Sequence, residues 1–300
     1  MPSLIDIRRR IRSVKNTQQI TRAMKFVAAA RLRRAQERVL AARPYARQIL
    51  RVLQSAEGRL EHAAHPLLEV RPDKNLLAIV ISADRGLCGA FNTNVLRKTS
   101  EFLREHAQQK IELAAVGKRI RDSLRRTKLP LKAEMIGATM AVKFEDAKEL
   151  AGLAIAAYTD GEADAVYVIY NEFRNVMVQR LVVARLLPIP PEAIAAPRGE
   201  AAADHGAAPP AAATQVDYIY EQPPADIFNR LVPRYLETEV YRALLESSAA
   251  EHAARMTAMD AATKNAADLI DSLTLHMNKV RQAAITKEII EVVSGAASAG

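Results

Sequence analysis

Two glycine-containing segments follow expected strands and are the first places to look for phosphate chemistry. Gly86-Leu87-Cys88-Gly89 follows one strand, and Gly117-Lys118-Arg119 follows the next. A phosphate-binding P-loop needs the spacing G-x-x-x-x-G-K-[ST], in which the final hydroxyl binds Mg²⁺. The first segment lacks that spacing and the second lacks the hydroxyl. We therefore favour a tight strand-to-helix turn over a nucleotide site.

Other catalytic and metal-binding chemistry has little support. Cys88 is the only cysteine, which excludes an internal disulfide and cysteine metal clusters and suits a reducing cytoplasmic compartment. With no histidine near it in the sequence, a half-buried structural thiol is favoured over a nucleophile. Residues 76–187 contain no convergent set of acid, base and nucleophile. We expect no enzyme active site and no cofactor. No metal-ligand spacing occurs among the six histidines: His62, His65, His106, His205, His252 and His276.

The charge of the chain is concentrated at one end. Residues 1–60 hold 15 Lys and Arg against three acidic residues, whereas the rest of the chain is nearly balanced. An acidic partner is expected for this segment, and nucleic acid, anionic lipid and an acidic protein surface all fit. A basic nucleic-acid-binding coiled coil is the alternative function. Against it, the basic residues surround an apolar seam, and Phe26 and Tyr45 are the only aromatic residues there.

Two long helices are expected to carry these residues. From Leu4 to Ala56, mostly small or apolar residues recur in alternating steps of three and four, the heptad spacing of a coiled-coil seam. Pro44 should kink this helix. The spacing returns from Ile227 and continues until Gly295 should end the second helix.

The middle of the chain has the alternating pattern of a small α/β domain. An Ala/Pro stretch over 188–213 then fits neither helix nor sheet and is expected to be an extended loop. The expected strands are 76–82, 111–116, 133–137, 164–170 and 176–187, with helices over 92–109, 117–127 and 144–160. The expected division is an N-terminal helix over 1–60, an α/β domain over 61–187, an Ala/Pro-rich segment over 188–226, a C-terminal helix over 227–294 and a tail over 295–300.

The predicted fold class is therefore α/β plus a long antiparallel coiled coil, in which the N- and C-terminal helices flank a small Rossmann-like α/β domain. The second helix is the longer one, so one of its ends should extend past the first and carry Ile285 and Ile289. Such an apolar end is expected to be covered by another protein. No apolar run approaches the ~18 residues of a membrane span, and no signal peptide is recognisable, so neither membrane insertion nor secretion is expected.

Three separated motifs along the chain are specific enough to point to a known family. The first is the run from Asn16 to Lys25, NTQQITRAMK, continued by VAAARLRRAQ. The second, SADRGLCGAFN, begins at Ser82, and the third, RQAAITKE, begins at Arg281 and continues to the final SGAA. Together, and in this order, these motifs resemble the gamma subunit of bacterial F-type ATP synthases, and the resemblance covers nearly the whole chain.

The resemblance implies a non-catalytic central rotor stalk of the proton-translocating enzyme. One copy would turn within a ring of three alpha and three beta subunits and couple ion-driven rotation to their catalytic sites. The α/β domain would form a foot bound to the epsilon subunit and the c-subunit ring, at the cytoplasmic face of the inner membrane. The residues implied at the alpha/beta ring are Met24, Lys25, Arg255, Gln282, Ile285 and Ile289. The residues implied at the foot are Tyr218, Tyr220 and Glu221.

Overall fold

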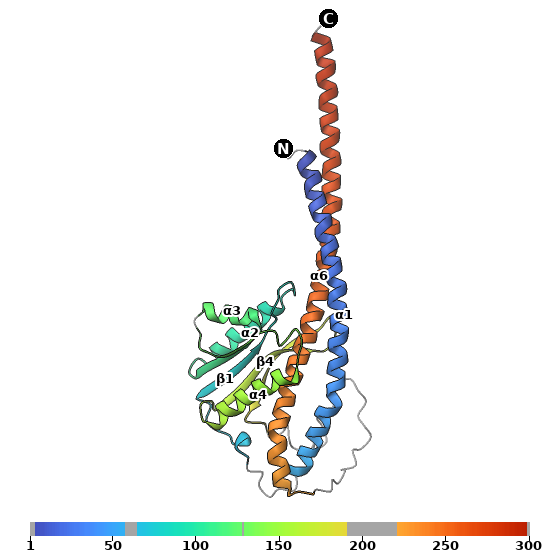
Figure 1. Ribbon diagram of the computed structural model, residues 1–300. Coiled ribbons are helices and arrows are strands. Elements are labelled where there is room, and N and C mark those ends of the chain that lie inside the picture. Colours follow the sequence, from blue (N-terminus) through green and yellow to red (C-terminus); the bar gives the residue numbers. More distant parts are fainter. Residues whose placement is uncertain (1–3, 58–64, 128, 191–220, 299–300) are drawn as a thin grey trace. The chain divides into compact units, whose positions relative to one another are not determined.

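The computed structural model describes residues 4–57, 65–127, 129–190 and 221–298 (Figure 1). The chain divides into two units, which are described separately. One combines residues 1–30 with 255–300, and the other comprises residues 31–254. Two long helices contribute to both units: α1, Leu4–Glu57, and α6, Pro224–Ser298.

Both helices follow the expected heptad seams closely. Along α1 and α6, every seam residue is buried or half-buried, and Ala28 and Leu53 are almost completely covered. Helix α1 continues through Pro44, where a kink is expected. Helix α6 begins before Ile227 and continues past Gly295, so the expected stop at that glycine is wrong. A glycine inside a helix costs only about 1 kcal/mol relative to alanine, so it does not have to end one.

In the unit formed by residues 1–30 and 255–300, the helices pair antiparallel. The hydroxyls of Thr21 and Thr263 are 2.8 Å apart, and Lys25 contacts Asp260, so residue numbers rise on α1 as they fall on α6. The C-terminal end of α6 extends past the start of α1 (Figure 1). Large apolar side chains on this extension are exposed: Ile285, Ile289, Ile290, Val292 and Val293.

The unit of residues 31–254 contains a five-stranded sheet in the order β3-β2-β1-β4-β5. The first four strands in that order are parallel to their neighbours, and β5 pairs antiparallel with β4. This confirms the predicted mixture of a Rossmann-like sheet and long flanking helices. The strands are β1 Asn75–Ile81, β2 Lys110–Val116, β3 Leu131–Met135, β4 Ala165–Phe173 and β5 Gln179–Leu187. The helices between them are η1 Pro66–Leu68, α2 Phe91–Glu105, α3 Lys118–Arg126 and α4 Phe144–Thr159.

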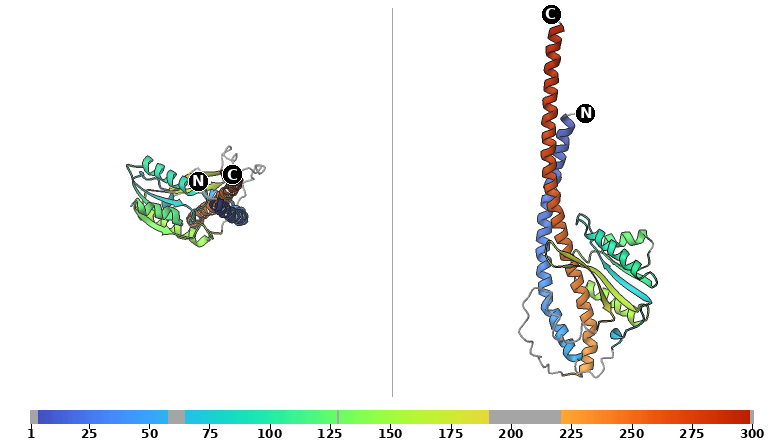
Figure 2. Two further views of the ribbon diagram at one scale, coloured as in Figure 1. Left: turned by 90° about the horizontal axis from the view of Figure 1, so that it is seen from above. Right: turned by 180° about the vertical axis from the view of Figure 1, so that it is seen from behind.

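Helices cover both faces of the sheet (Figure 2). On one face, Phe102 of α2 and Ile120 of α3 pack against alternate residues of β1, β2 and β4. Helix α4 lies on the other face beside α6, where the rings of Phe144 and Tyr241 meet edge to face at 5.5 Å. Burial on both faces explains why β1 reads as a continuous apolar run rather than an alternating one.

The carboxyl edge of the parallel strands, where open α/β sheets commonly hold ligands, is filled by the chain itself. Asp84, after β1, accepts hydrogen bonds from the backbone N–H groups of Lys118 at 3.0 Å and Gly137 at 3.1 Å. Beside it, Cys88 is buried in a cluster that includes Phe91 and Ala250 of α6. The glycine-containing segment after β1 therefore connects a strand to a helix and packs against α6.

Gly117 is required by close packing at the same edge. Its φ of +98° is unfavourable for residues with a side chain, and an added Cβ would lie 2.3 Å from the carbonyl oxygen of Ser82. The hydroxyl of Ser82 in turn accepts the backbone N–H of Ile120 at 3.0 Å. The backbones after β1 and β2 thus approach too closely for any larger residue.

Candidate interaction surface

The expected ring-contact residues lie at two levels of the helix pair formed by residues 1–30 and 255–300. The pairing of Thr21 with Thr263 places Met24 and Lys25 near residue 260 of α6. Gln282 lies 22 positions further along α6, which is about 33 Å at 1.5 Å per residue. The structure therefore does not bring the expected residues together into one site, but distributes them along the helices.

Lys25 is engaged within the chain. Its Nζ lies 2.5 Å from Oδ1 of Asp260, whose other oxygen is 3.1 Å from Nζ of Lys264. The hydrogen bond from Lys25, and to a smaller extent the one from Lys264, holds the pKa of the Asp260 carboxyl below its usual range. Met24, the neighbouring residue, is half-buried. A partner reaching this level would meet a lysine that is already paired, beside a partly covered methionine.

Arg255 and Gln282 differ in accessibility. Arg255 is only 9% exposed, so little of its side chain is left for a partner. Gln282 is exposed, as are Ile285 and Ile289, which are 48% and 57% exposed. These three residues are spaced three and four positions apart and share one face of the helix. The accessible part of the expected surface is therefore the amide and isoleucine face of the α6 extension.

Of the expected foot residues, only Glu221 lies within the described part of the chain. It is exposed and precedes the start of α6 at Pro224. Tyr218 and Tyr220 lie outside the described residues.

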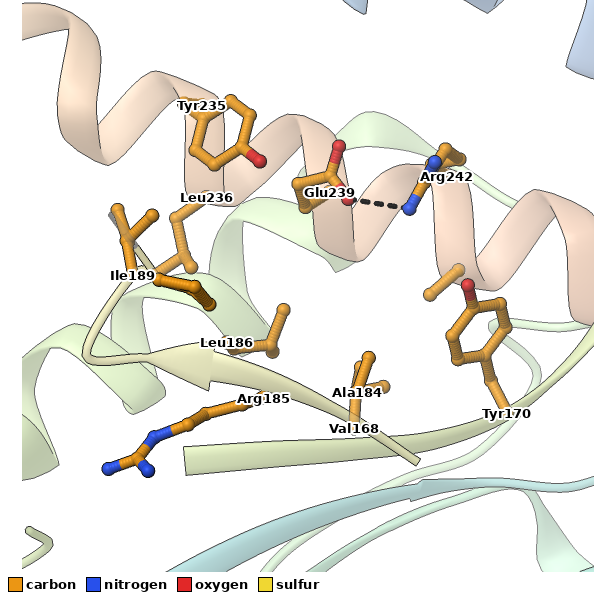
Figure 3. Close-up of a pocket in the computed structure, with 12 residues that line it drawn as sticks. Val168, Tyr170, Ala184, Arg185, Leu186, Ile189, Tyr235, Leu236, Glu239 and Arg242 are labelled. Atoms are coloured by element: carbon orange, nitrogen blue, oxygen red, sulfur yellow. Dashed lines mark ion pairs between the residues drawn. The ribbon is translucent and has the colours of Figure 1, made fainter. Parts of the chain in front are cut away.

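A second polar site, which the sequence did not reveal, lies between the sheet and α6 in the unit of residues 31–254. Here a cavity of about 230 Å³ is bounded by β4 and β5 on one side and α6 on the other (Figure 3). Glu239 and Arg242 form an ion pair of 2.7 Å along its helical wall. Burial raises the pKa of the Tyr170 hydroxyl, at the opposite wall, to about 12.

Next to this cavity, Glu246 carries an unusual carboxyl group. Burial raises its pKa to about 7, although the nearby guanidinium of Arg242 opposes the increase. One of its oxygens is buried and makes no hydrogen bond within the described structure. Glu239, Arg242 and Glu246 recur at helical spacing among buried residues of α6, which is the sequence signal that could have identified them.

Within the described residues, no group of His, Cys, Asp and Glu has the arrangement of a metal site. None of the described helices is both long enough and apolar enough to cross a membrane.

Sequence and structure comparisons find similarity to subunits of ATP synthases. The family model described as ATP synthase matches residues 3–299. The ATP synthase gamma chain of Solibacter usitatus is 52% identical over 303 residues, covering 100% of both chains. That of Pelotomaculum thermopropionicum is 48% identical over 299 residues, covering 99% of each. A chain in the rotor structure of the Euglena gracilis mitochondrial ATP synthase matches with a TM-score of 0.64 at 20% identity, covering 94% of this chain and 98% of that one.

Proposed function

We propose a mechanical role from one premise: the chain belongs to the ATP synthase gamma chain family. It is the central rotor stalk subunit of the proton-translocating F-type ATP synthase and couples ion-driven rotation to the conformational cycle of the catalytic sites. It is a non-catalytic subunit of that enzyme. The observation that carries this function is full-length similarity at about 50% identity, with no large part of the chain left over for another activity. The nucleic-acid-binding alternative draws no support from these relatives.

The partners are proposed from the same premise. One copy of the chain would associate with three alpha and three beta subunits, with the epsilon subunit and with the c-subunit ring. The complex would hold it peripherally at the cytoplasmic face of the inner membrane. In this proposal, the rotating shaft consists of residues 1–60 and 227–294. The contacts at its foot are made by residues 61–187 and 188–226.

The accessible face of the α6 extension supports a ring contact there. Ile285 and Ile289 are large apolar side chains exposed on a single unpaired helix, an arrangement that favours burial against another protein. Gln282 on the same face adds a polar contact. Met24, Lys25 and Arg255 are proposed for the lower part of the ring contact, and Tyr218, Tyr220 and Glu221 for the foot.

Asymmetry gives this arrangement its function. A single pair of helices has no three-fold symmetry, so it cannot present the same surface to three equivalent catalytic subunits at once. Each catalytic subunit would therefore be held in a different conformation, and rotation would exchange these conformations. Differential contact energies shift such equilibria, and partly solvated ion pairs worth about 0.2–1 kcal/mol each can be exchanged readily during rotation.

Co-expression with alpha and beta subunits of a bacterial ATP synthase tests the proposal. We expect one complex with a mass corresponding to about one copy of this chain per three alpha and three beta chains, and steady ATP hydrolysis that depends on this chain. Elution of the chain apart from alpha and beta, together with nucleic acid in a salt-dependent way, would contradict it.

A further inference from the structure

A small basic cleft in the unit of residues 31–254 has no role in the function proposed above. Its volume is about 210 Å³, equal to that of about seven water molecules at ~30 Å³ each. It is bounded by α1, by residues 140–142 after β3, and by α6. Three arginines of α1 line it, Arg31, Arg34 and Arg38, and none of the described residues lining it is acidic.

The three arginines share one helix face and are available to a ligand. Their spacing of three and then four positions places them in one row along α1. None of the three forms an ion pair with a described residue. By contrast, Arg33 lies on another face of the same turn and pairs with Glu37 at 3.3 Å. Glu37, the acidic residue next to Arg38 in the sequence, is therefore engaged by Arg33.

The opposite walls of the cleft are largely apolar. Val142 and Leu245 are buried, and the hydroxyl of Ser248 already donates to the carbonyl oxygen of Thr139 at 2.8 Å. An apolar wall lowers the local dielectric constant and so strengthens the interaction of an anion with the guanidinium groups. His252 is a further polar residue on the α6 wall, and the arginine charges of the cleft are all supplied from one side, by α1.

We propose that this cleft binds a small, multiply charged phosphate compound, with Arg31, Arg34 and Arg38 as its ligands. Each guanidinium can donate two parallel hydrogen bonds to a phosphate, and the positive charges are uncompensated by carboxylates in the cleft. Enclosure by three chain segments and a volume of about 210 Å³ favour a compact anion over a polypeptide segment. Because the ligand would bridge α1, the loop after β3 and α6, its binding should stabilise this unit by mass action.

The test is isothermal titration calorimetry of the full-length chain with sodium pyrophosphate, at an ionic strength held constant with sodium chloride. We expect saturable binding. Arg31→Gln, Arg34→Gln and Arg38→Gln should each weaken it about tenfold, the usual effect of losing a hydrogen bond to a charged group. Arg33→Gln, one position away on the same helix, is the matched control and should bind as the wild type does. Far-ultraviolet circular dichroism and the Tm without ligand establish that each variant is folded.

Several results would overturn the proposal. Absence of saturable binding by the wild type would do so, as would equal weakening by Arg33→Gln and Arg34→Gln, because the effect would then be general electrostatics. Capture of the chain by vesicles of anionic phospholipid, or binding to poly-glutamate, without binding of pyrophosphate would assign the cleft to a different kind of partner. None of these results depends on the rotor function, because the assay uses the isolated chain.

Discussion

An ion pair joins Lys25 of α1 to Asp260 of α6, with 2.5 Å between the ammonium nitrogen and a carboxylate oxygen across 235 positions of the sequence. The hydroxyls of Thr21 and Thr263 meet one helical turn away, at 2.8 Å. Apolar seams alone allow neighbouring helices to slide by a heptad, whereas these polar pairs each have one matching position. Together they fix the register of α1 against α6 in this unit.

Replacing the carboxylate in this pair should lower stability in a pH-dependent way. Lys25 and Lys264 lower the pKa of folded Asp260, so the ion pairs stabilise the folded state above the ordinary aspartate pKa of about 3.9. This stabilisation is lost as the pH falls through the lower folded-state pKa. We expect Asp260→Asn to reduce the Tm at pH 7 but to have little effect on the Tm at pH values below the folded-state pKa of Asp260. Asp268→Asn, at an exposed position of the same helix, is the control. An equal loss at every pH would contradict the ion-pair explanation.

Enlarging a small seam residue should overpack the helix pair. Ala266 is 8% exposed within the seam of α6, so Ala266→Leu has no room for its added atoms. We expect a loss of about 1–3 kcal/mol in the free energy of unfolding, measured by urea denaturation. Asn265→Leu adds the same side chain at the neighbouring exposed position and should change stability by no more than about 0.5 kcal/mol. Similar values for the two variants would show that the seam register is wrong.

Removing the charge of Glu246 should stabilise the chain at alkaline pH. Its folded-state pKa of about 7 lies above the ordinary glutamate value, so the folded state holds its proton more tightly than the unfolded state. Stability should therefore fall as the pH rises from about 4.5 to 7. Glu246→Gln removes this penalty, and we expect it to be more stable than the wild type at pH 8 by about 1–2 kcal/mol.

The same two proteins should differ little at pH 4.5, where the wild-type side chain is already neutral in the folded state. Guanidinium chloride unfolding at both pH values measures the difference. Glu149→Gln, on the exposed face of α4, should leave the pH dependence unchanged. A wild-type stability that does not fall between pH 4.5 and 8 would contradict the raised pKa.

Substitutions on the α6 extension should separate assembly from folding. Ile289 is 57% exposed in the isolated chain, so Ile289→Asp should leave its Tm almost unchanged. If this face is buried in the ring, a charge there should weaken assembly by about 2 kcal/mol or more and lower chain-dependent ATP hydrolysis. Size-exclusion chromatography and a hydrolysis assay of the reconstituted complex measure the two effects. Wild-type assembly and activity would remove this residue from the proposed contact.

Reversing the charge of Arg255 should instead lower the stability of the isolated chain. This residue is 9% exposed within the chain, and a buried charge that loses its favourable surroundings typically costs about 3–5 kcal/mol. We therefore expect Arg255→Glu to lower the Tm of the isolated chain, whereas Gln282→Ala should not. Thermal unfolding of the two variants, without any partner, makes the comparison. An unchanged Tm for Arg255→Glu would show that its burial contributes little to folding and would favour a contact role.

Periodicity made most of the fold predictable from the sequence. The heptad spacing identifies the buried face of each long helix because side chains three and four positions apart share a face whatever they pack against. The continuous apolar run of β1 identifies it as a strand covered on both sides. The run NTQQITRAMK and the two later motifs identify the family. In contrast, the helix end expected at Gly295 depends on a small energy difference, and local sequence did not decide it.

Only the tertiary structure decided which polar groups meet. Lys25 and Asp260 are 235 positions apart, and the cleft joins Arg34 of α1 to Leu245 of α6. In the sequence, Glu246 cannot be distinguished from other helix-face glutamates, and its raised pKa results from burial in the folded chain. The physical reason is that electrostatic energy depends on distance and dielectric surroundings, both of which are set by folding. Residue type and spacing determine which side chains are buried, but not which charges are buried together.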